Sequence, residues 1–139
     1  MASIKRVLVV DDEPGIRALL RDALSRPGLQ VTLAGDGLEA VRLLRQQRYD
    51  AVVTDVNMPA MNGIDLLRWM KRNNRLEKVV VMSGSPRHDA LPGRGLPPVR
   101  AQFRKPFRVG PFKKTMEEVL ADRNRTSGRR STAGRKGAA

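Results

Sequence analysis

The stretch that decides the fold is Val7-Leu8-Val9-Val10-Asp11-Asp12, an apolar run followed at once by two carboxylates. An uninterrupted, mostly β-branched run of this kind is typical of a strand buried on both faces of a parallel sheet. Pro14 then stands where a helix can begin, and apolar residues recur at helical spacing from Ile16 to Leu24. The opening of the chain therefore predicts a β–α unit.

The same unit repeats along the chain. Asp36 and Glu39 have capping-box spacing ahead of a second helical pattern, and Asn62-Gly63 opens a third. Strand-like segments alternate with these helices at residues 29–34, 49–54, 79–82 and, more weakly, 101–105. This alternation predicts an α/β fold, a doubly wound, five-stranded parallel sheet with right-handed crossovers.

The pattern fails after the fourth strand. Residues 86–98 contain four prolines and two glycines, which a regular long helix does not tolerate. We therefore expect the fourth helix to be short, broken or missing. An apolar stripe at helical spacing returns after Pro111 and runs from Phe112 to Leu120.

Length and charge divide the chain into one domain and a tail. Of the net charge of +13, residues 1–122 carry +7, and residues 123–139, which contain six basic residues and no acid, carry +6. We expect a domain over 1–122 and a basic, flexible C-terminal tail over 123–139. The tail is interpreted first as a solvated end, then as a site of weak, salt-sensitive contact with nucleic acid or an acidic partner, and third as a linker. A sequence-specific DNA reader is not expected.

Composition excludes several kinds of chemistry. There is no cysteine and only one histidine, His88, which argues against disulfide scaffolds, thiolate zinc sites and His-based catalytic triads. No apolar run approaches the roughly 18 residues that span a bilayer, and the N-terminus has no signal-peptide pattern. We expect a cytoplasmic protein without membrane contact.

Polar residues interrupt the apolar strands where each strand ends. In a doubly wound sheet, ligands bind outside the carboxyl ends of the strands. Taken singly, each residue has an ordinary explanation as a helix cap, a turn residue or a solvated charge. Together, three carboxylates, a hydroxyl and an ammonium group could hold Mg²⁺ and carry out phosphoryl transfer onto an aspartate. The residues concerned are Asp11, Asp12, Asp55, Ser83 and Lys105.

The sequence resembles the receiver domain of bacterial two-component response regulators, in the stand-alone, CheY-like form, over roughly residues 4–122. The resemblance implies the flavodoxin-like strand order 2-1-3-4-5. It rests on four motifs in the family's order, namely Val9-Val10-Asp11-Asp12-Glu13, Thr54-Asp55-Val56-Asn57-Met58-Pro59 with Gly63, Met82-Ser83-Gly84, and Lys105-Pro106-Phe107.

The resemblance also implies a role for each matching residue. Asp55 would be the phosphoacceptor, and Asp11, Asp12, Asp55 and the backbone carbonyl of Asn57 would hold Mg²⁺. Ser83 and Lys105 would contact the phosphoryl group and act in the switch. Asn57 and Ser85 occupy positions that tune dephosphorylation.

One site position departs from the family pattern. Three residues before the lysine, the family usually has an aromatic residue whose rotation reports phosphorylation, and this chain has Gln102 there. The neighbouring Phe103 would face the other way on a strand unless a bulge re-registers it. We favour absence of the ring movement. With the altered 86–98 segment, this puts the family's usual output face in question.

Two functions remain open at this point. The first is a single-domain response regulator that accepts a phosphoryl group on Asp55 from a histidine kinase or phosphotransfer protein. It would signal by phosphorylation-dependent binding of an unknown downstream protein or by phosphorelay, as a switch and not as an enzyme. The alternative is a phosphorylation-independent, receiver-like interaction module that uses the 86–98 loop and the basic tail. A magnesium-dependent hydrolase lacks the expected Asp-x-Asp spacing.

Overall fold

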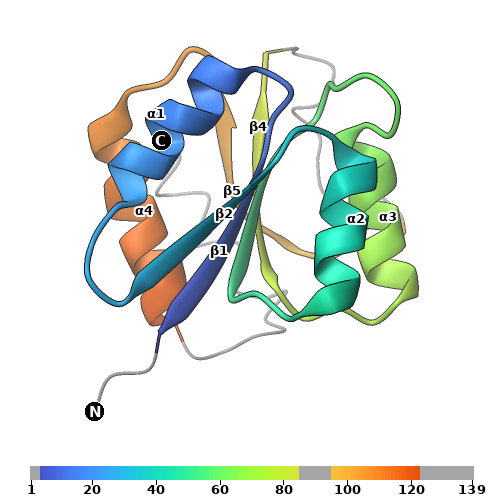
Figure 1. The fold of residues 1–139 in the computed structure, drawn as a ribbon. Coiled ribbons are helices and arrows are strands. Elements are labelled where there is room, and N and C mark those ends of the chain that lie inside the picture. Colours follow the sequence, from blue (N-terminus) through green and yellow to red (C-terminus); the bar gives the residue numbers. More distant parts are fainter. Residues whose placement is uncertain (1–3, 85–94, 123–139) are drawn as a thin grey trace.

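The computed structural model describes residues 4–84 and 95–122 of the chain. The described elements alternate between strands and helices (Figure 1). In chain order they are β1 (Lys5–Val10), α1 (Pro14–Leu24), β2 (Leu29–Ala34), α2 (Gly37–Gln46), β3 (Ala51–Asp55), α3 (Gly63–Arg72), β4 (Lys78–Ser83), β5 (Val99–Arg104) and α4 (Val109–Ala121).

The strands form one five-stranded sheet in the order β2-β1-β3-β4-β5, and every neighbouring pair is parallel. The predicted fold class and strand order are therefore confirmed. Figure 1 shows α1 and α4 on one side of the sheet and α2 and α3 on the other. Every strand thus points its carboxyl end toward the same edge, where Asp11, Asp55 and Ser83 lie.

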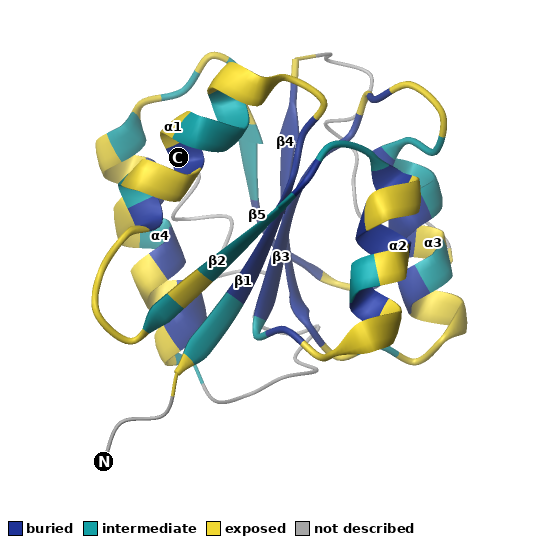
Figure 2. Ribbon diagram, viewed as in Figure 1, coloured by how far each residue is buried: buried dark blue, intermediate teal, exposed yellow. Residues whose placement is uncertain are grey.

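Each face of the sheet has its own core. Strand residues alternate between the two, so Leu8 and Val10 pack toward α2 and α3, whereas Val7 and Val9 pack toward α1 and α4. Figure 2 shows the consequence, because the central strands are buried and each helix is buried only where it meets the sheet. A strand buried on both faces must be apolar throughout, which explains the uninterrupted runs in the sequence.

Local signals in the sequence set the helix starts. The Asp36 side chain accepts a hydrogen bond from the Glu39 backbone N–H at 2.8 Å, as the capping-box spacing predicts. The Glu39 carboxylate reaches back to the Gly35 N–H at 2.8 Å, one residue before the cap. At α3, the Asn62 side chain accepts from the Asp65 N–H at 2.9 Å.

Three predictions concern segments at the limits of the described residues. The described residues 95–98, which precede β5, contain no helix. Residues 85–94, which include Ser85 and most of the interval between β4 and β5, lie outside the described residues. The predicted tail, 123–139, also lies outside them, while α4 ends at Ala121. Within the described ranges, every helix is too short or too polar to cross a bilayer.

Candidate functional site

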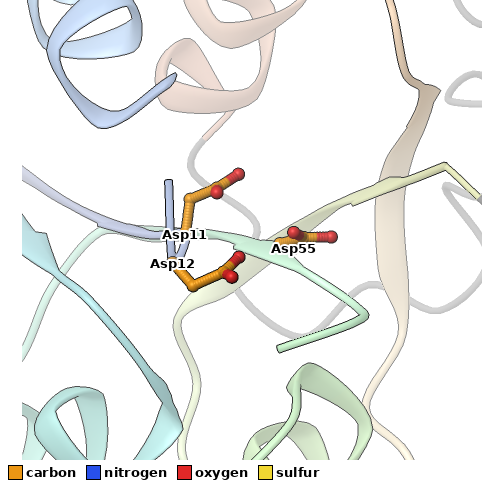
Figure 3. A group of neighbouring side chains, drawn as sticks. All are labelled: Asp11, Asp12 and Asp55. Carbon is orange, nitrogen blue, oxygen red and sulfur yellow. The ribbon is translucent and has the colours of Figure 1, made fainter. Parts of the chain in front are cut away.

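Three carboxylates meet at the carboxyl edge of the sheet. Asp11 and Asp12 follow the last residue of β1, and Asp55 is the last residue of the adjacent parallel strand β3 (Figure 3). Each side chain offers one oxygen, and these oxygens all lie within 4.8 Å of one another. Strand pairing therefore brings together residues that stand more than 40 positions apart in the sequence.

Asp11 is the fully buried member of this group, with 0% of the residue exposed. Its Oδ1 accepts a hydrogen bond from the Glu13 N–H at 2.9 Å, so one carboxylate oxygen is held by the turn into α1. Its backbone carbonyl accepts a hydrogen bond from the Arg17 guanidinium at 2.6 Å. These contacts hold Asp11 in one orientation before any ligand arrives.

Lys105 joins the carboxylates from across the sheet. It follows β5, and its Nζ donates to Asp11 Oδ2 at 2.8 Å and to Asp55 Oδ2 at 3.1 Å. The exposed Glu13 carboxylate lies further off, at 3.5 Å. The backbone N–H of Lys105 donates to the Ser83 carbonyl at 2.8 Å, which ties this position to the end of β4. The peptide bond between Lys105 and Pro106 is cis.

Burial and charge act in opposite directions on these groups. Burial raises the pKa of Asp55 above its ordinary value of 3.8, and the neighbouring Asp11 adds to the rise, while the hydrogen bond and charge of Lys105 only partly oppose it. Burial alone would lower the pKa of Lys105, but its hydrogen bonds to Asp11 and Asp55 raise it overall. Lys105 is therefore a cation, and the site carries more negative charge than Lys105 neutralises.

The remaining predicted residues take different places around Asp55. Ser83 is buried at the end of β4, the next strand along this edge. The backbone N–H of Asn57 lies 3.3 Å from Asp55 Oδ1, a long contact that places Asn57 beside the acceptor carboxylate. The Asn57 carbonyl as a metal ligand stays a prediction. Asp12 is exposed, and its carboxylate is open to solvent.

The residues present fit a divalent cation of the magnesium class. Mg²⁺ takes oxygen ligands, usually one or two carboxylates together with water and phosphate oxygens. The cluster supplies carboxylate oxygens from one buried and one exposed residue at the end of β1 and from Asp55. A cation here would also relieve the unfavourable burial of the ionised Asp55.

Gln102, which stands where the family usually has an aromatic residue, lies on β5 just after an irregularity in the pairing with β4. The ladder between β4 and β5 shifts register after Val79, because Val79 pairs with Val99 but Val80 pairs with Ala101. Beyond this irregularity, Gln102 pairs with Val81 and Phe103 with Met82. A bulge is thus present upstream of both residues. Beyond it Phe103 packs on the α1 and α4 side, so the bulge does not bring this ring to the face of Gln102.

Arg17 is a site residue that the sequence pattern does not single out. The spacing places it on a helix, but its contact with the Asp11 carbonyl depends on how α1 leaves the sheet.

The sequence identifies Gly63 only as part of a motif. The structure shows its physical basis, because a Cβ at this position would lie 2.1 Å from the Asp55 carbonyl oxygen.

Comparisons with known proteins agree with this geometry. The chain is 34% identical over 122 residues to a probable chemotaxis protein CheY from Rhizobium etli, covering 83% of this chain and 92% of that protein. It is 29% identical over 116 residues to sporulation initiation phosphotransferase F from Bacillus subtilis, covering 84% and 94%. Among solved structures, it is similar to the response regulator protein TrrA from Thermotoga maritima in complex with Mg(2+)-BeF, with a TM-score of 0.72 and 26% identity, covering 84% of this chain and 99% of that one.

A family model places the chain more directly. The model of the response regulator receiver domain matches residues 7–93, which is more than half of the chain. The match includes most of β1, all of β3 and β4, and the acidic and hydroxyl residues at their carboxyl ends. The chain therefore belongs to the response regulator receiver domain family, the two-component signalling modules that interact with histidine kinases or phosphotransfer proteins.

Proposed function

We propose that this protein is a phosphorylation-dependent switch in which Asp55 accepts a phosphoryl group from a phosphohistidine of a sensor histidine kinase or phosphotransfer protein. One observation carries the proposal, namely the Lys105 ammonium group bound to both Asp11 and Asp55. This arrangement supports the proposal, because a carboxylate that could act as nucleophile, a cation, and a carboxylate pair that could hold a metal lie at one edge of the sheet.

The proposed step is a transfer between two protein side chains. An Asp55 carboxylate oxygen attacks the phosphorus, the P–N bond to the donor imidazole breaks, and the imidazole nitrogen keeps the electron pair. The product is an acyl phosphate, and its hydrolysis returns the carboxylate and inorganic phosphate. The domain promotes its own modification and acts as a switch rather than as a metabolic enzyme.

Each residue of the site has its own role in the proposed step. Lys105 moves from the Asp55 carboxylate to a phosphoryl oxygen, and the Ser83 hydroxyl donates to another. Asp11, Asp12, Asp55 and the Asn57 carbonyl would hold Mg²⁺, which receiver domains bind through an acidic pocket. When bound, Mg²⁺ would neutralise the negative charge on the phosphoryl oxygens. The similar structure in complex with Mg(2+)-BeF supports this assignment.

The downstream step is binding of a partner protein or relay of the phosphoryl group. The similarity to a chemotaxis protein favours partner binding, whereas the similarity to a phosphotransferase favours relay. Asn57 and Ser85 would set the lifetime of the acyl phosphate. Contact with nucleic acid, if any, would be weak and would come through the basic tail.

The first experiment measures intact mass after incubation with Mg²⁺ and acetyl phosphate. We expect a single phosphoryl adduct that is absent with a chelator and absent in Asp55→Asn. Asp22→Asn is the matched control, because it removes an exposed carboxylate far along α1 and should label like the parent. If Asp55→Asn is still labelled, the phosphoacceptor is a residue other than Asp55.

The second candidate is the phosphorylation-independent interaction module. It is favoured by the position of Phe103, because no ring stands at residue 102 on the face that carries α2 and α3. Titration with beryllofluoride and Mg²⁺ separates the two functions. A protein that neither labels with acetyl phosphate nor responds to beryllofluoride is the interaction module.

A further inference from the structure

We infer that phosphorylation is read out through a cluster of three phenylalanine rings, Phe103, Phe107 and Phe112, which couples Lys105 to α4. The inference rests on the proposed function and names the element that carries its signal. The direction follows from the fold, since the rings lie on the face covered by α1 and α4 and away from α2 and α3.

The three rings are in mutual contact. The centroids of Phe103 and Phe107 lie 5.3 Å apart, those of Phe103 and Phe112 lie 5.4 Å apart, and those of Phe107 and Phe112 lie 5.5 Å apart. Their planes are tilted, edge-on and stacked respectively, which are geometries that aromatic pairs favour. Phe112 is fully buried, and the other two rings are half-buried at the margin of the core.

The cluster is attached to the site on both sides of Lys105. Phe103 precedes Lys105 by two residues and Phe107 follows it by two. The backbone N–H of Lys105 is bound to the Ser83 carbonyl, so a movement of Ser83 or of Lys105 reaches this segment directly. Because rings in contact pack without free volume, a displacement of one ring requires the others to follow.

A phosphoryl group on Asp55 supplies the displacement. In the unphosphorylated structure the Lys105 ammonium group is shared between Asp11 and Asp55. A phosphoryl group presents its oxygens further from the Asp55 backbone than the carboxylate oxygens do, so Lys105 must take a new position to bind them. Phe112, in the first turns of α4, then carries the change to that helix.

The composition of the chain makes this testable by fluorine NMR. The sequence contains three phenylalanines, and all three are in the cluster, so fluorophenylalanine labels the cluster alone. We would add Mg²⁺ and beryllofluoride as the phosphoryl stand-in. Its bound fluorides resonate apart from those of the rings, so one spectrum reports both the occupancy of Asp55 and the state of the cluster. We expect all three ring resonances to shift on saturation.

Substitutions in the cluster and on α3 separate coupling through the rings from a direct electrostatic effect. The double variant Phe103→Leu/Phe107→Leu removes both rings that contact Phe112, and we expect bound beryllofluoride to persist while the Phe112 resonance no longer shifts. If the double variant does not fold, Phe107→Leu alone is used, and we then expect the Phe112 shift to be smaller than in the parent. Trp69→Phe adds a fourth fluorine on α3, on the opposite face, and we expect it to shift less than Phe112.

The outcomes distinguish the inference from the function on which it rests. Bound beryllofluoride with an unmoved Phe112 resonance overturns the inference and leaves the switch intact. A Phe112 shift in the Phe103→Leu/Phe107→Leu variant equal to that in the parent also overturns it, because the shift would then be a direct field effect. A shift seen only for the fluorine at position 69 would also overturn the inference, because the signal would then pass through α3 and not through α4. Absence of bound beryllofluoride contradicts the proposed function, and the inference falls with it.

Discussion

Asp55 is held in an environment that disfavours its ionised form, and Lys105 offsets this only in part. Burial is the main cause of its raised pKa, and the buried Asp11 adds to it. A carboxylate in this environment gains from a bound cation, because the cation neutralises its charge. The same unfavourable burial of charge lowers the stability of the fold while the site holds no ligand.

Asp55→Asn should therefore stabilise the metal-free protein at neutral pH. Because the folded-state pKa of Asp55 is raised, its contribution to stability is full below about pH 3.8 and is lost as the pH rises through the folded-state pKa. At pH 7 we expect the variant to gain on the order of 1 kcal/mol in the free energy of unfolding, the usual scale of a single substitution. Chemical denaturation with a chelator present measures it.

The control for Asp55→Asn is Asp12→Asn. Asp12 is exposed, so solvent already stabilises its charge and its removal should change stability less. If Asp55→Asn instead lowers the free energy of unfolding, the ion pair with Lys105 stabilises Asp55 by more than burial destabilises it.

The backbone of Asp55 leaves no room for a side chain at position 63, so this position requires glycine. A Cβ on Gly63 would stand 2.1 Å from the Asp55 carbonyl oxygen and 2.9 Å from Val56 Cα, and neither backbone atom can yield without moving the site. We expect Gly63→Ala to cost roughly 1–3 kcal/mol in stability, in the range of other overpacking substitutions, and to slow labelling of Asp55. Thermal unfolding and the rate of acetyl phosphate labelling measure the two effects.

The matched control is Gly110→Ala, where a Cβ meets nothing within 4 Å. It lies in the first turn of α4, and alanine there should be neutral or slightly stabilising. Equal behaviour of the two variants would mean that the end of β3 relaxes easily around a larger residue.

At the scale of elements, a buried ion pair joins the far ends of the helices on one face. Arg75 Nη2 lies 2.6 Å from Glu77 Oε2, with side-chain exposures of 12% and 2%. Arg75 also donates to the Leu44 and Gln47 carbonyls at the end of α2, and Glu77 accepts from the Tyr49 N–H at 3.0 Å. The pair thus anchors the loop between α3 and β4 to the entry of β3, at the end of the sheet opposite the site.

Glu77→Gln should destabilise the protein by about 3 kcal/mol, because it leaves the largely enclosed Arg75 side chain without its counter-charge. Asp22→Asn, which breaks the exposed pair with Arg21, should cost about 0.5 kcal/mol or less. Denaturant unfolding compares them. Trp69 fluorescence gives a local readout, since the Arg75 guanidinium carbon lies 5.9 Å from the centre of that ring. Equal effects of the two variants would show that the Arg75–Glu77 pair does not anchor the loop.

At the scale of the whole molecule, the described fold extends to the last residue of the predicted domain. Lys78 Nζ donates to the Val119 carbonyl at 2.9 Å, and Arg100 donates to Asp122 at 2.8 Å. Two cations buried in the sheet therefore hold the C-terminal end of α4. Burial and the neighbouring Arg100 lower the pKa of Lys78, as expected for cations crowded at one end of a sheet.

A protein ending at residue 122 should keep the Tm of the parent within a few degrees and label at the same rate, because α4 remains anchored. Binding to polyanions should become weaker, since residues 123–139 carry +6 of the net charge of +13. Thermal unfolding, acetyl phosphate labelling and heparin binding at two salt concentrations test this. A truncated protein that unfolds would place the domain boundary further along the chain.

Much of the fold and of the site could be predicted from the amino-acid sequence. Apolar runs ending in Asp11, Asp55 and Ser83 imply a parallel sheet, and parallel strands bring their carboxyl ends to one edge. Residues at those ends must then lie near one another, whatever the details of packing. The strand over 29–34 and the cap at Asp36 followed from equally local signals.

Contacts between distant segments could not be predicted in this way. Periodicity places Lys105 at the site edge but not on Asp11, 94 residues away, nor does it show that Glu77 and Lys78 are buried charges. The face on which Phe103 lies depends on the irregularity between Val99 and Ala101, which shifts every later side chain of β5 by one place. Such outcomes depend on packing across the sheet, and the free energy of that packing is a property of the folded chain rather than of any local stretch of it.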